Sequence, residues 1–251
     1  TTATDTFNVA VGYEAGGAVT TGVQNTLIGG LAGDALTDAD FNVAVGQGAV
    51  GSDTLGSRST GLGYGTLANQ NFTTATDTYN TAVGYEAGVA VTTGKKNTLL
   101  GSLAGHALTT GLTNVVVGAQ ALSLDTLGSL STAIGYSALE NQNFTTATDS
   151  HNTAVGFKAG HIVTTGVQNT LLGSLAGDAL TDADFNVALG YAALSSDTLG
   201  SRSVAIGRNA LEAQNFTTAT ASNNTAVGYE VGRNMTTGID NVLYGSNAGY
   251  A

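Results

Sequence analysis

The sequence of 251 residues contains no cysteine, no proline and no tryptophan, and few of its residues are charged or aromatic. Without cysteine there is no disulfide framework, no thiolate metal site and no cysteine nucleophile. Charged residues make up 10% and aromatic residues 6% of the chain, whereas glycine occurs 36 times. Aromatic and long aliphatic side chains fill most globular cores, so this composition favours a thin structure closed by small residues.

Basic residues are also scarce. Seven Lys and Arg against 18 Asp and Glu give a formal net charge of −11, and the seven are scattered along the sequence. Nucleic-acid binding needs a basic stripe that neutralises phosphates, so the composition excludes a nucleic-acid partner. No apolar run approaches the roughly 20 residues that a helix needs to cross a bilayer, so we expect no membrane span.

What the sequence does contain is a repeat. A five-residue unit such as SVAIG at 203–207 occurs fourteen times, and the first residue of each copy is called position 0. Position 4 is always glycine, position 1 is Val or Thr, and position 3 is a bulky apolar residue. A β-branched, apolar run that ends at glycine is typical of a strand followed by a tight turn.

The units recur at regular intervals. Their first residues are Asn8, Asn25, Asn42, Ser59, Asn80, Asn97, Asn114, Ser131, Asn152, Asn169, Asn186, Ser203, Asn224 and Asn241. The spacings are 17, 17, 17 and 21 residues, and this set returns as a 72-residue cycle. Such periods indicate a solenoid. The sequence therefore predicts one all-β, parallel β-solenoid domain over 1–251, with cycles 8–79, 80–151 and 152–223 and a partial cycle 224–251.

Features within each turn lead to further expectations. We expect a second short strand after each tight turn, near 18–20 and 35–37. Position 7 is Ala in twelve copies, which predicts a close approach between walls. Asn at position 0 tolerates left-handed backbone geometry, and stacked Asn side chains can hydrogen-bond along a ladder. The four extra residues of each long turn predict surface protrusions, anchored by Phe72, Phe144 and Phe216.

Both faces of the expected strands are apolar, as in TLL at 98–100 and VVV at 115–117. Alternation places positions 1 and 3 on one face of the strand and position 2 on the other. A solenoid covers one face with its own opposite wall, and the chain has nothing else to cover the second. The sequence thus predicts a parallel homo-oligomer whose copies pack through the outer strand faces.

The repeat resembles a known family. SVAIG resembles the head repeats of YadA-type trimeric autotransporter adhesins, and NTAVGYEAG with TTG spacers is similar to repeats of phage tail-fibre proteins. The resemblance covers essentially all 251 residues. It implies a left-handed parallel β-roll, a homotrimer, and an extracellular fibre on a cell surface or virion that presents a binding surface, for example to a surface glycan or receptor.

Candidate catalytic residues are few. His106, His151 and His161 differ from their counterparts in the other cycles, which is typical of surface variation. A glycan hydrolase of the tailspike kind would need a distinctive pair of carboxylates in a groove. The carboxylates recur with the repeat instead, so the sequence predicts no enzyme and no catalytic residue.

Recurring carboxylates indicate turn chemistry, because Asp side chains bond to the local backbone. The recurring sets are Asp53, Asp125 and Asp197, and Asp5, Asp77 and Asp149. The pairs Asp38 with Asp40 and Asp182 with Asp184 offer oxygens that suit Ca²⁺. The middle cycle has Thr110 and Leu112 at those places, and the calcium motif of RTX rolls is absent. We therefore predict no metal or cofactor site.

Aromatic residues recur at position 5. They are Tyr13, Tyr64, Tyr85, Tyr136, Phe157, Tyr191 and Tyr229. Exposed rings of this kind can stack on sugars or pack on one another along the solenoid. The sequence favours packing along the solenoid.

Together these features predict a non-catalytic structural protein of an extracellular fibre, such as a shaft or head segment of a phage tail fibre or surface adhesin. The alternative is a filament subunit that polymerises end to end, because neither end of the repeat array carries a polar cap. A third hypothesis is a binding module that uses the loops at Phe72, Phe144 and Phe216. The sequence begins at Thr1 inside a connection that matches 73–79, so we expect a piece of a longer chain.

Overall fold

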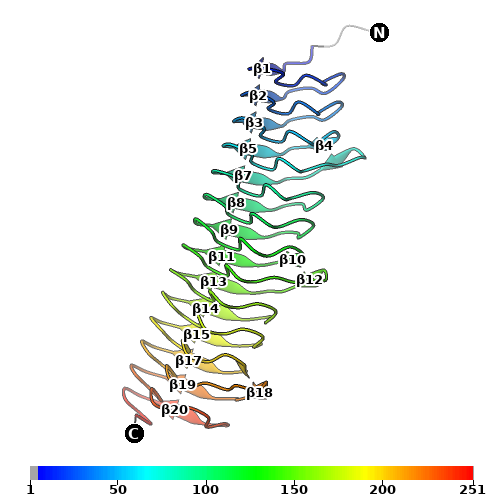
Figure 1. The fold of residues 1–251 in the computed structure, drawn as a ribbon. Coiled ribbons are helices and arrows are strands. Elements are labelled where there is room, and N and C mark those ends of the chain that lie inside the picture. The colour runs from blue at the N-terminus through cyan, green and yellow to red at the C-terminus, as the bar shows by residue number, and fades with distance from the viewer. Residues whose placement is uncertain (1–4, 251) are drawn as a thin grey trace. The chain divides into compact units, whose positions relative to one another are not determined.

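The computed structural model describes residues 5–250, which form short strands and turns (Figure 1). The predicted all-β, parallel solenoid is confirmed, with one main strand in each turn of the repeat. The chain divides into two compact units, 1–119 and 120–251. The connection expected at 1–7 lies partly outside the described residues. Within 5–250, no helix is long and apolar enough to span a bilayer.

The first unit contains seven main strands in one parallel ladder. They are β1 (Val9–Val11), β2 (Thr26–Ile28), β3 (Val43–Val45), β5 (Thr60–Leu62), β7 (Thr81–Val83), β8 (Thr98–Leu100) and β9 (Val115–Val117). A separate two-residue pair, β4 (Gly56–Ser57) with β6 (Thr76–Asp77), lies at the long turn. The loop that carries β6 reaches beyond the neighbouring turns of this unit (Figure 1).

The second unit repeats this plan with seven main strands. They are β11 (Thr132–Ile134), β13 (Thr153–Val155), β14 (Thr170–Leu172), β15 (Val187–Leu189), β17 (Val204–Ile206), β19 (Thr225–Val227) and β20 (Val242–Tyr244). Its long turns carry two further pairs, β10 (Gly128–Ser129) with β12 (Thr148–Asp149), and β16 (Gly200–Ser201) with β18 (Thr220–Ala221).

The second strand expected in every turn is absent from the described residues. Segments 18–20 and 35–37 are turns and bends, although their amides still bond to the next turn, as in Thr20 N to Thr37 O at 3.0 Å. Second strands occur only as the two-residue pairs at the long turns. The prediction was wrong because some amides of this segment bond within their own turn, as Val19 N does to Gly16 O at 3.1 Å, so no continuous ladder forms.

Neighbouring turns pair in identical register. Val9 faces Thr26, Ala10 faces Leu27 and Val11 faces Ile28, so position 1 pairs with position 1 of the next turn. All other printed pairs of main strands keep this rule, including those on either side of a 21-residue turn. Each repeat position therefore forms a column of side chains along its unit.

Glycine at position 4 is required by the closeness of adjacent turns. Gly29 has a φ of 131°, in the positive region that L residues rarely adopt. A Cβ added to Gly29 would lie 2.6 Å from the carbonyl oxygen of Gly46 in the next turn. The backbones of adjacent turns are thus in direct contact at position 4, and a side chain of any size there would force the turns apart.

Asn at position 0 does not adopt left-handed geometry, contrary to expectation. The left-handed residues are at position 6, position 8 and the residue before position 0, for example Leu31, Val50 and Phe41. The expected Asn ladder is confirmed: the Asn25 side-chain Nδ2 donates to Asn8 Oδ1 at 3.3 Å, and the Asn25 backbone N–H donates to the same oxygen at 2.8 Å. The Asn8 side-chain amide also donates to the Gly22 carbonyl at 2.7 Å, which ties the start of a turn to its end.

The interior is a narrow column of small and aliphatic side chains. Position 2 faces inward, and Leu27 and Ala44 there are almost fully buried. Ala at position 7 is buried in most turns, which confirms the predicted close approach of the walls. A large side chain at one interior position is matched by a small one at its neighbour. A Cβ on Gly33 would lie 2.7 Å from Leu27 Cδ2, so the leucine occupies the space that glycine leaves.

Replacing Gly29 with Ala tests the contact between adjacent turns. We expect Gly29→Ala to lower the free energy of unfolding by about 3 kcal/mol, from backbone strain and the clash with Gly46. The neighbouring Gly30 is the matched control, since a Cβ there meets nothing closer than 3.9 Å. Gly30→Ala should change stability by less than about 0.5 kcal/mol, and urea denaturation followed by circular dichroism measures both. Equal midpoints for the two variants would contradict the account.

Candidate functional surface

The outward face of the main strands is apolar and open. Positions 1 and 3 point away from the interior, since position 2 between them is buried. Leu62 is 45% exposed and Leu172 is 40% exposed, whereas Leu27 on the inner face is 1% exposed. Other exposed side chains of this face are Val9, Val11, Ile28, Val43, Val115 and Leu189. We call the position 1 and 3 columns the outer strand face.

Aromatic rings at position 5 form a second surface column, next to the turn that follows each strand. Tyr64 and Tyr85 stack with centroids 5.4 Å apart and planes at 8°, and Tyr136 stacks on Phe157 at 5.7 Å. The guanidinium of Arg208 lies 5.8 Å from the Tyr191 ring and 5.6 Å from the Tyr229 ring. The predicted packing of aromatic rings along the solenoid is therefore confirmed for the pairs Tyr64 with Tyr85 and Tyr136 with Phe157.

The three histidines do not converge on one site. His106 Nε2 lies 3.4 Å from Glu86 Oε2, and His161 Nδ1 lies 3.4 Å from Glu140 Oε2. His151 is exposed near the long turn of the second cycle. Each histidine thus belongs to a different turn, and His106 and His161 each lie next to a glutamate of the preceding turn.

The paired carboxylates considered for calcium are bonded to the preceding turn. Asp38 Oδ1 accepts from the Thr21 hydroxyl at 2.5 Å, and Asp40 Oδ1 accepts from the Val23 amide at 2.8 Å. Asp182 and Asp184 repeat both contacts. Within 5–250, no three His, Asp or Glu side chains lie close enough to share a metal ion.

Asp125 heads a buried polar network. Its Oδ1 accepts from the amides of Gly128 at 3.1 Å and Phe144 at 3.3 Å, and its Oδ2 accepts from Gln142 Nε2 at 2.6 Å. The same Gln142 nitrogen donates to Ser131 Oγ, and Gln142 Oε1 accepts from Asn152 Nδ2 at 2.8 Å. The carboxylate therefore bonds to the local backbone, as predicted, and also links two successive turns.

The network occurs once in each complete cycle. Asp53 with Gln70 and Asp197 with Gln214 make the same contacts, and all of these side chains are fully buried. Asp77 differs from the expected turn chemistry, because its carboxylate binds the side chains of Arg58 and Tyr79. Recurring carboxylates thus serve two purposes, one inside the solenoid and one on its surface.

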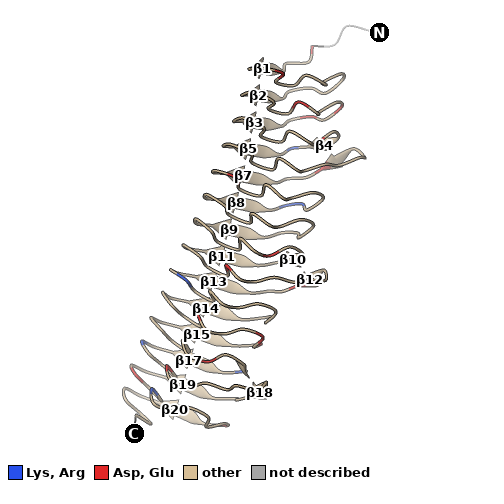
Figure 2. Ribbon diagram, in the orientation of Figure 1, with Lys and Arg blue, Asp and Glu red and all other residues tan. Residues whose placement is uncertain are grey.

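Burial raises the pKa values of two aspartates in the second unit. Burial raises the pKa of Asp125 above its ordinary value of 3.8, against hydrogen bonds from Gln142 and the backbone that lower it. Burial likewise raises the pKa of Asp178, against a backbone hydrogen bond and the positive charge of Lys158, which lower it. On the surface, acidic and basic residues are dispersed along the turns of each unit (Figure 2).

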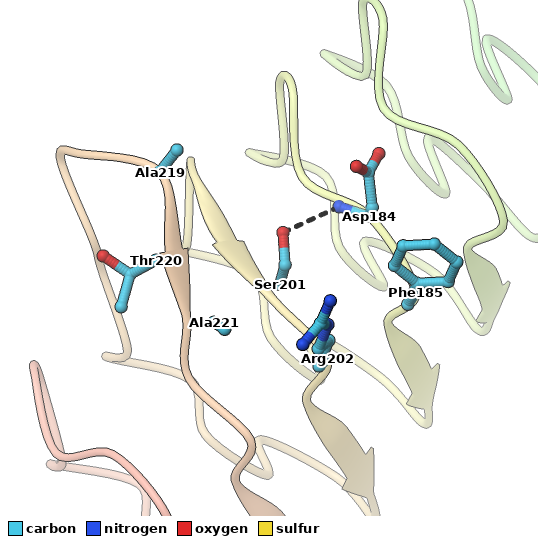
Figure 3. Close-up of a pocket in the computed structure, with 7 residues that line it drawn as sticks. All are labelled: Asp184, Phe185, Ser201, Arg202, Ala219, Thr220 and Ala221. Atoms are coloured by element: carbon cyan, nitrogen blue, oxygen red, sulfur yellow. Dashed lines mark hydrogen bonds between the residues drawn. The ribbon is translucent and has the colours of Figure 1, made fainter.

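The long turns border two open grooves of about 220 Å³ each. One in the second unit lies between Phe185, Arg202 and Thr220 (Figure 3). One in the first unit is lined by Lys95, Lys96 and Asp77, together with Leu112 and Thr113. Both lie beside the exposed segments at the long turns, where Phe72, Phe144 and Phe216 are buried anchors, as predicted.

Sequence reasoning did not predict the buried network or the grooves. A signal for the network exists, because position 11 reads Val or Leu in the first two turns of a cycle and Asp, then Gln, in the next two. The sequence contains no comparable pattern for the grooves, because their shape depends on which side chains of successive turns contact one another.

No protein-family model, no curated protein and no solved structure matches this chain.

Replacing Gln142 with Leu tests the buried network. The change removes the amide that bonds to Asp125, Ser131 and Asn152, so we expect a loss of about 3 kcal/mol in the free energy of unfolding. Gln168→Leu is the matched control, because that side chain is exposed, and it should change stability by less than about 0.5 kcal/mol. Thermal and urea denaturation compare the two. Gln142→Leu as stable as the control would show that the network adds nothing.

Proposed function

We propose that the chain is a non-catalytic structural protein of an extracellular fibre, built as a homotrimer whose copies lie parallel and pack through the outer strand face. Its mechanism is mechanical. Backbone ladders run along the axis, apolar faces join the copies, and a weakly charged acidic surface faces water.

The observation that carries this proposal is the open outer strand face. Leu62, Leu172 and Leu189 are each about two-fifths exposed in the single chain, and within each unit positions 1 and 3 are at least partly exposed in every main strand. Full burial of one such side chain is worth roughly 1.5–3 kcal/mol, so even partial burial repeated over many turns favours association. A continuous apolar face of this kind on a single chain marks an interaction surface.

The charge distribution suits assembly through this face. Positions 1 and 3 carry no Asp, Glu, Lys or Arg in any of the fourteen copies, although the chain has a net charge of −11. Copies that meet there avoid direct contact between like charges, while the acidic residues remain on other sides of each turn.

The absence of a catalytic role is part of the proposal. The recurring carboxylates described above are bonded to backbone or side-chain partners, such as Asp53 to Gln70 and Asp77 to Arg58. Location outside the cell, the number of three copies and left-handedness come from the resemblance of the repeat to adhesin heads and phage tail fibres.

Two other hypotheses predict different behaviour. An end-to-end filament would lengthen as the concentration rises, without any dependence on the outer strand face. A binding module at the long turns would act through exposed residues such as Thr73 and Thr74, because Phe72 beside them is buried. Shortening those loops would then abolish binding and leave the mass in solution unchanged.

Charges placed on the outer strand face test the assembly. We expect the unaltered chain to have three times its single-chain mass of 24.9 kDa by light scattering. Leu172→Glu combined with Leu189→Glu places carboxylates on adjacent strands of this face and should reduce the mass to one chain. The control combines Thr145→Glu with Thr146→Glu, which adds the same charge on an exposed loop and should leave the trimer intact.

Two results would overturn the proposal. An unaltered chain of 24.9 kDa at all concentrations would show that the outer strand face stays in water. A mass that rises without limit, equally in both double variants, would instead support the end-to-end filament, and electron microscopy over the same concentration series would show its length.

A further inference from the structure

One groove of the second unit contains an arginine without an acidic partner. The groove has a volume of about 220 Å³ and is lined by Asp184, Phe185, Ser201, Arg202, Thr220 and Ala221, among others (Figure 3). The Arg202 guanidinium lies 6.0 Å from the centre of the Phe185 ring. Within the described part of the chain, Arg202 makes no ion pair.

In the first cycle a carboxylate occupies this place. Arg58, the counterpart of Arg202, lies over the Phe41 ring at 4.9 Å, and its Nε donates to Asp77 Oδ1 at 2.8 Å. Tyr79 completes the cluster, because its hydroxyl donates to Asp77 Oδ2 at 3.1 Å. A carboxylate thus lies against the arginine and is bonded through both of its oxygens.

The third cycle has the arginine, Arg202, but no acidic residue at the position of Asp77. Ala221 stands where the first cycle has Asp77, and Asn223 stands where it has Tyr79. The Asn223 side chain donates to Asp240 at 3.0 Å, so a different turn engages it. The groove therefore lies beside the Arg202 guanidinium, where Ala221 is smaller than Asp77 and the Asn223 side chain bonds to another turn.

The second cycle has the opposite combination. It has Leu130 in place of the arginine and keeps the acid as Asp149, which is exposed. The three cycles thus present an ion pair, an acid alone and an arginine alone on one backbone framework. Leu130 has a φ of 61°, close to the 64° of Arg202, so the framework accepts leucine at this position.

We propose that the Arg202 groove binds a carboxylate supplied by a small ligand, which takes the place that Asp77 occupies in the first cycle. The guanidinium offers paired N–H donors that match a carboxylate. Ser201 Oγ accepts from the Asp184 amide at 2.9 Å, which leaves its hydroxyl hydrogen for a ligand oxygen. The open groove has room for a small organic acid or one acidic sugar ring.

Asp184 does not prevent this binding. Its Oδ1 accepts from the Val167 amide at 2.8 Å, so its charge is already partly satisfied. Its counterpart Asp40 makes the same contact with Val23, and the Arg58–Asp77 pair forms beside it. A second carboxylate is therefore compatible with this framework. The proposal goes beyond the structural role above and concerns a site that a single chain contains complete.

The test is a titration of the full chain, with isotope-labelled arginine side chains and backbone amides followed by NMR. The probes are acetate, glucuronate and the uncharged methyl ester of glucuronate at constant ionic strength. We expect acetate and glucuronate to give saturable shifts at Arg202 Nε and Ser201 with dissociation constants on the order of millimolar, and the ester to give none. A tighter response to glucuronate than to acetate assigns the site to an acidic sugar, and equal responses assign it to small carboxylates generally.

Three variants locate the response. Arg202→Leu copies the second cycle and should abolish the shifts at Ser201. Ala221→Asp copies the first cycle, supplies an internal carboxylate, and should weaken binding on the order of tenfold. Arg58→Leu removes the paired arginine of the first cycle and should leave the titration unchanged.

The proposal is overturned if neither carboxylate gives a saturable shift, if the ester matches glucuronate, or if Arg202→Leu still responds. Circular dichroism of each variant, compared with the unaltered chain, separates loss of the site from loss of the fold. The mass in solution is measured on the same samples, so a failure of this site and a failure of the trimer give different results.

Discussion

The close contact between backbones at position 4 constrains the rest of the structure. Because Gly29 lies against Gly46, and position 4 glycines of adjacent turns within each unit stack in the same way, these turns meet with no side chain between them. Stacking at one point in every turn fixes the register of the whole turn, so each position meets its own counterpart. The Asn ladder then ties the start of a turn to its end and to its neighbour. Repetition of the sequence follows from this geometry, because a column accepts only side chains that suit their own copies.

The interior side chains at positions 8 and 11 change from turn to turn and repeat every 72 residues. Two turns carry Val or Leu at position 11 with Gly at position 8, and the next two carry Asp and Gln with a larger side chain at position 8. The buried Asp and Gln bond to each other, to Ser at position 0 and to the next Asn, so the polar pair satisfies its own hydrogen-bonding groups. The network also anchors the long turn, since Asp53 Oδ1 accepts from the Phe72 amide. Position 0 of this turn is Ser59, whose hydroxyl oxygen accepts from Gln70 Nε2, while Gln70 Oε1 accepts from the side chain of the following Asn80.

The repeat itself was sufficient to predict the solenoid, the main strands, the Asn ladder and the buried Phe anchors, because all of these depend on one column at a time. Features that depend on several repeat positions at once were not predicted from the sequence. Left-handed position 6 and the residue before position 0 carry varied residue types, such as Leu31 and Phe41, and position 8 is Gly in some turns but a larger residue such as Val50 in others. The residue types therefore did not identify these positions, and the left-handed geometry was predicted for Asn instead. The second strand was overpredicted at 18–20 because the Val19 amide bonds to Gly16 within its own turn, which the apolar pattern of the sequence does not reveal. The Arg202 groove depends on a comparison of three side chains across cycles, and only the structure shows that Arg58 meets Asp77.

We propose that the chain covers one face of the main strands itself and that other copies cover the second. A soluble paramagnetic agent tests this claim in the full chain with labelled Leu and Ile methyl groups, since it broadens only the signals that solvent reaches. The inner Leu171 is the buried reference, and Leu124, exposed outside the outer strand face, is the open one. The account predicts that Leu62 and Leu172 are protected as Leu171 is. Broadening of their signals as strong as that of Leu124 would contradict it.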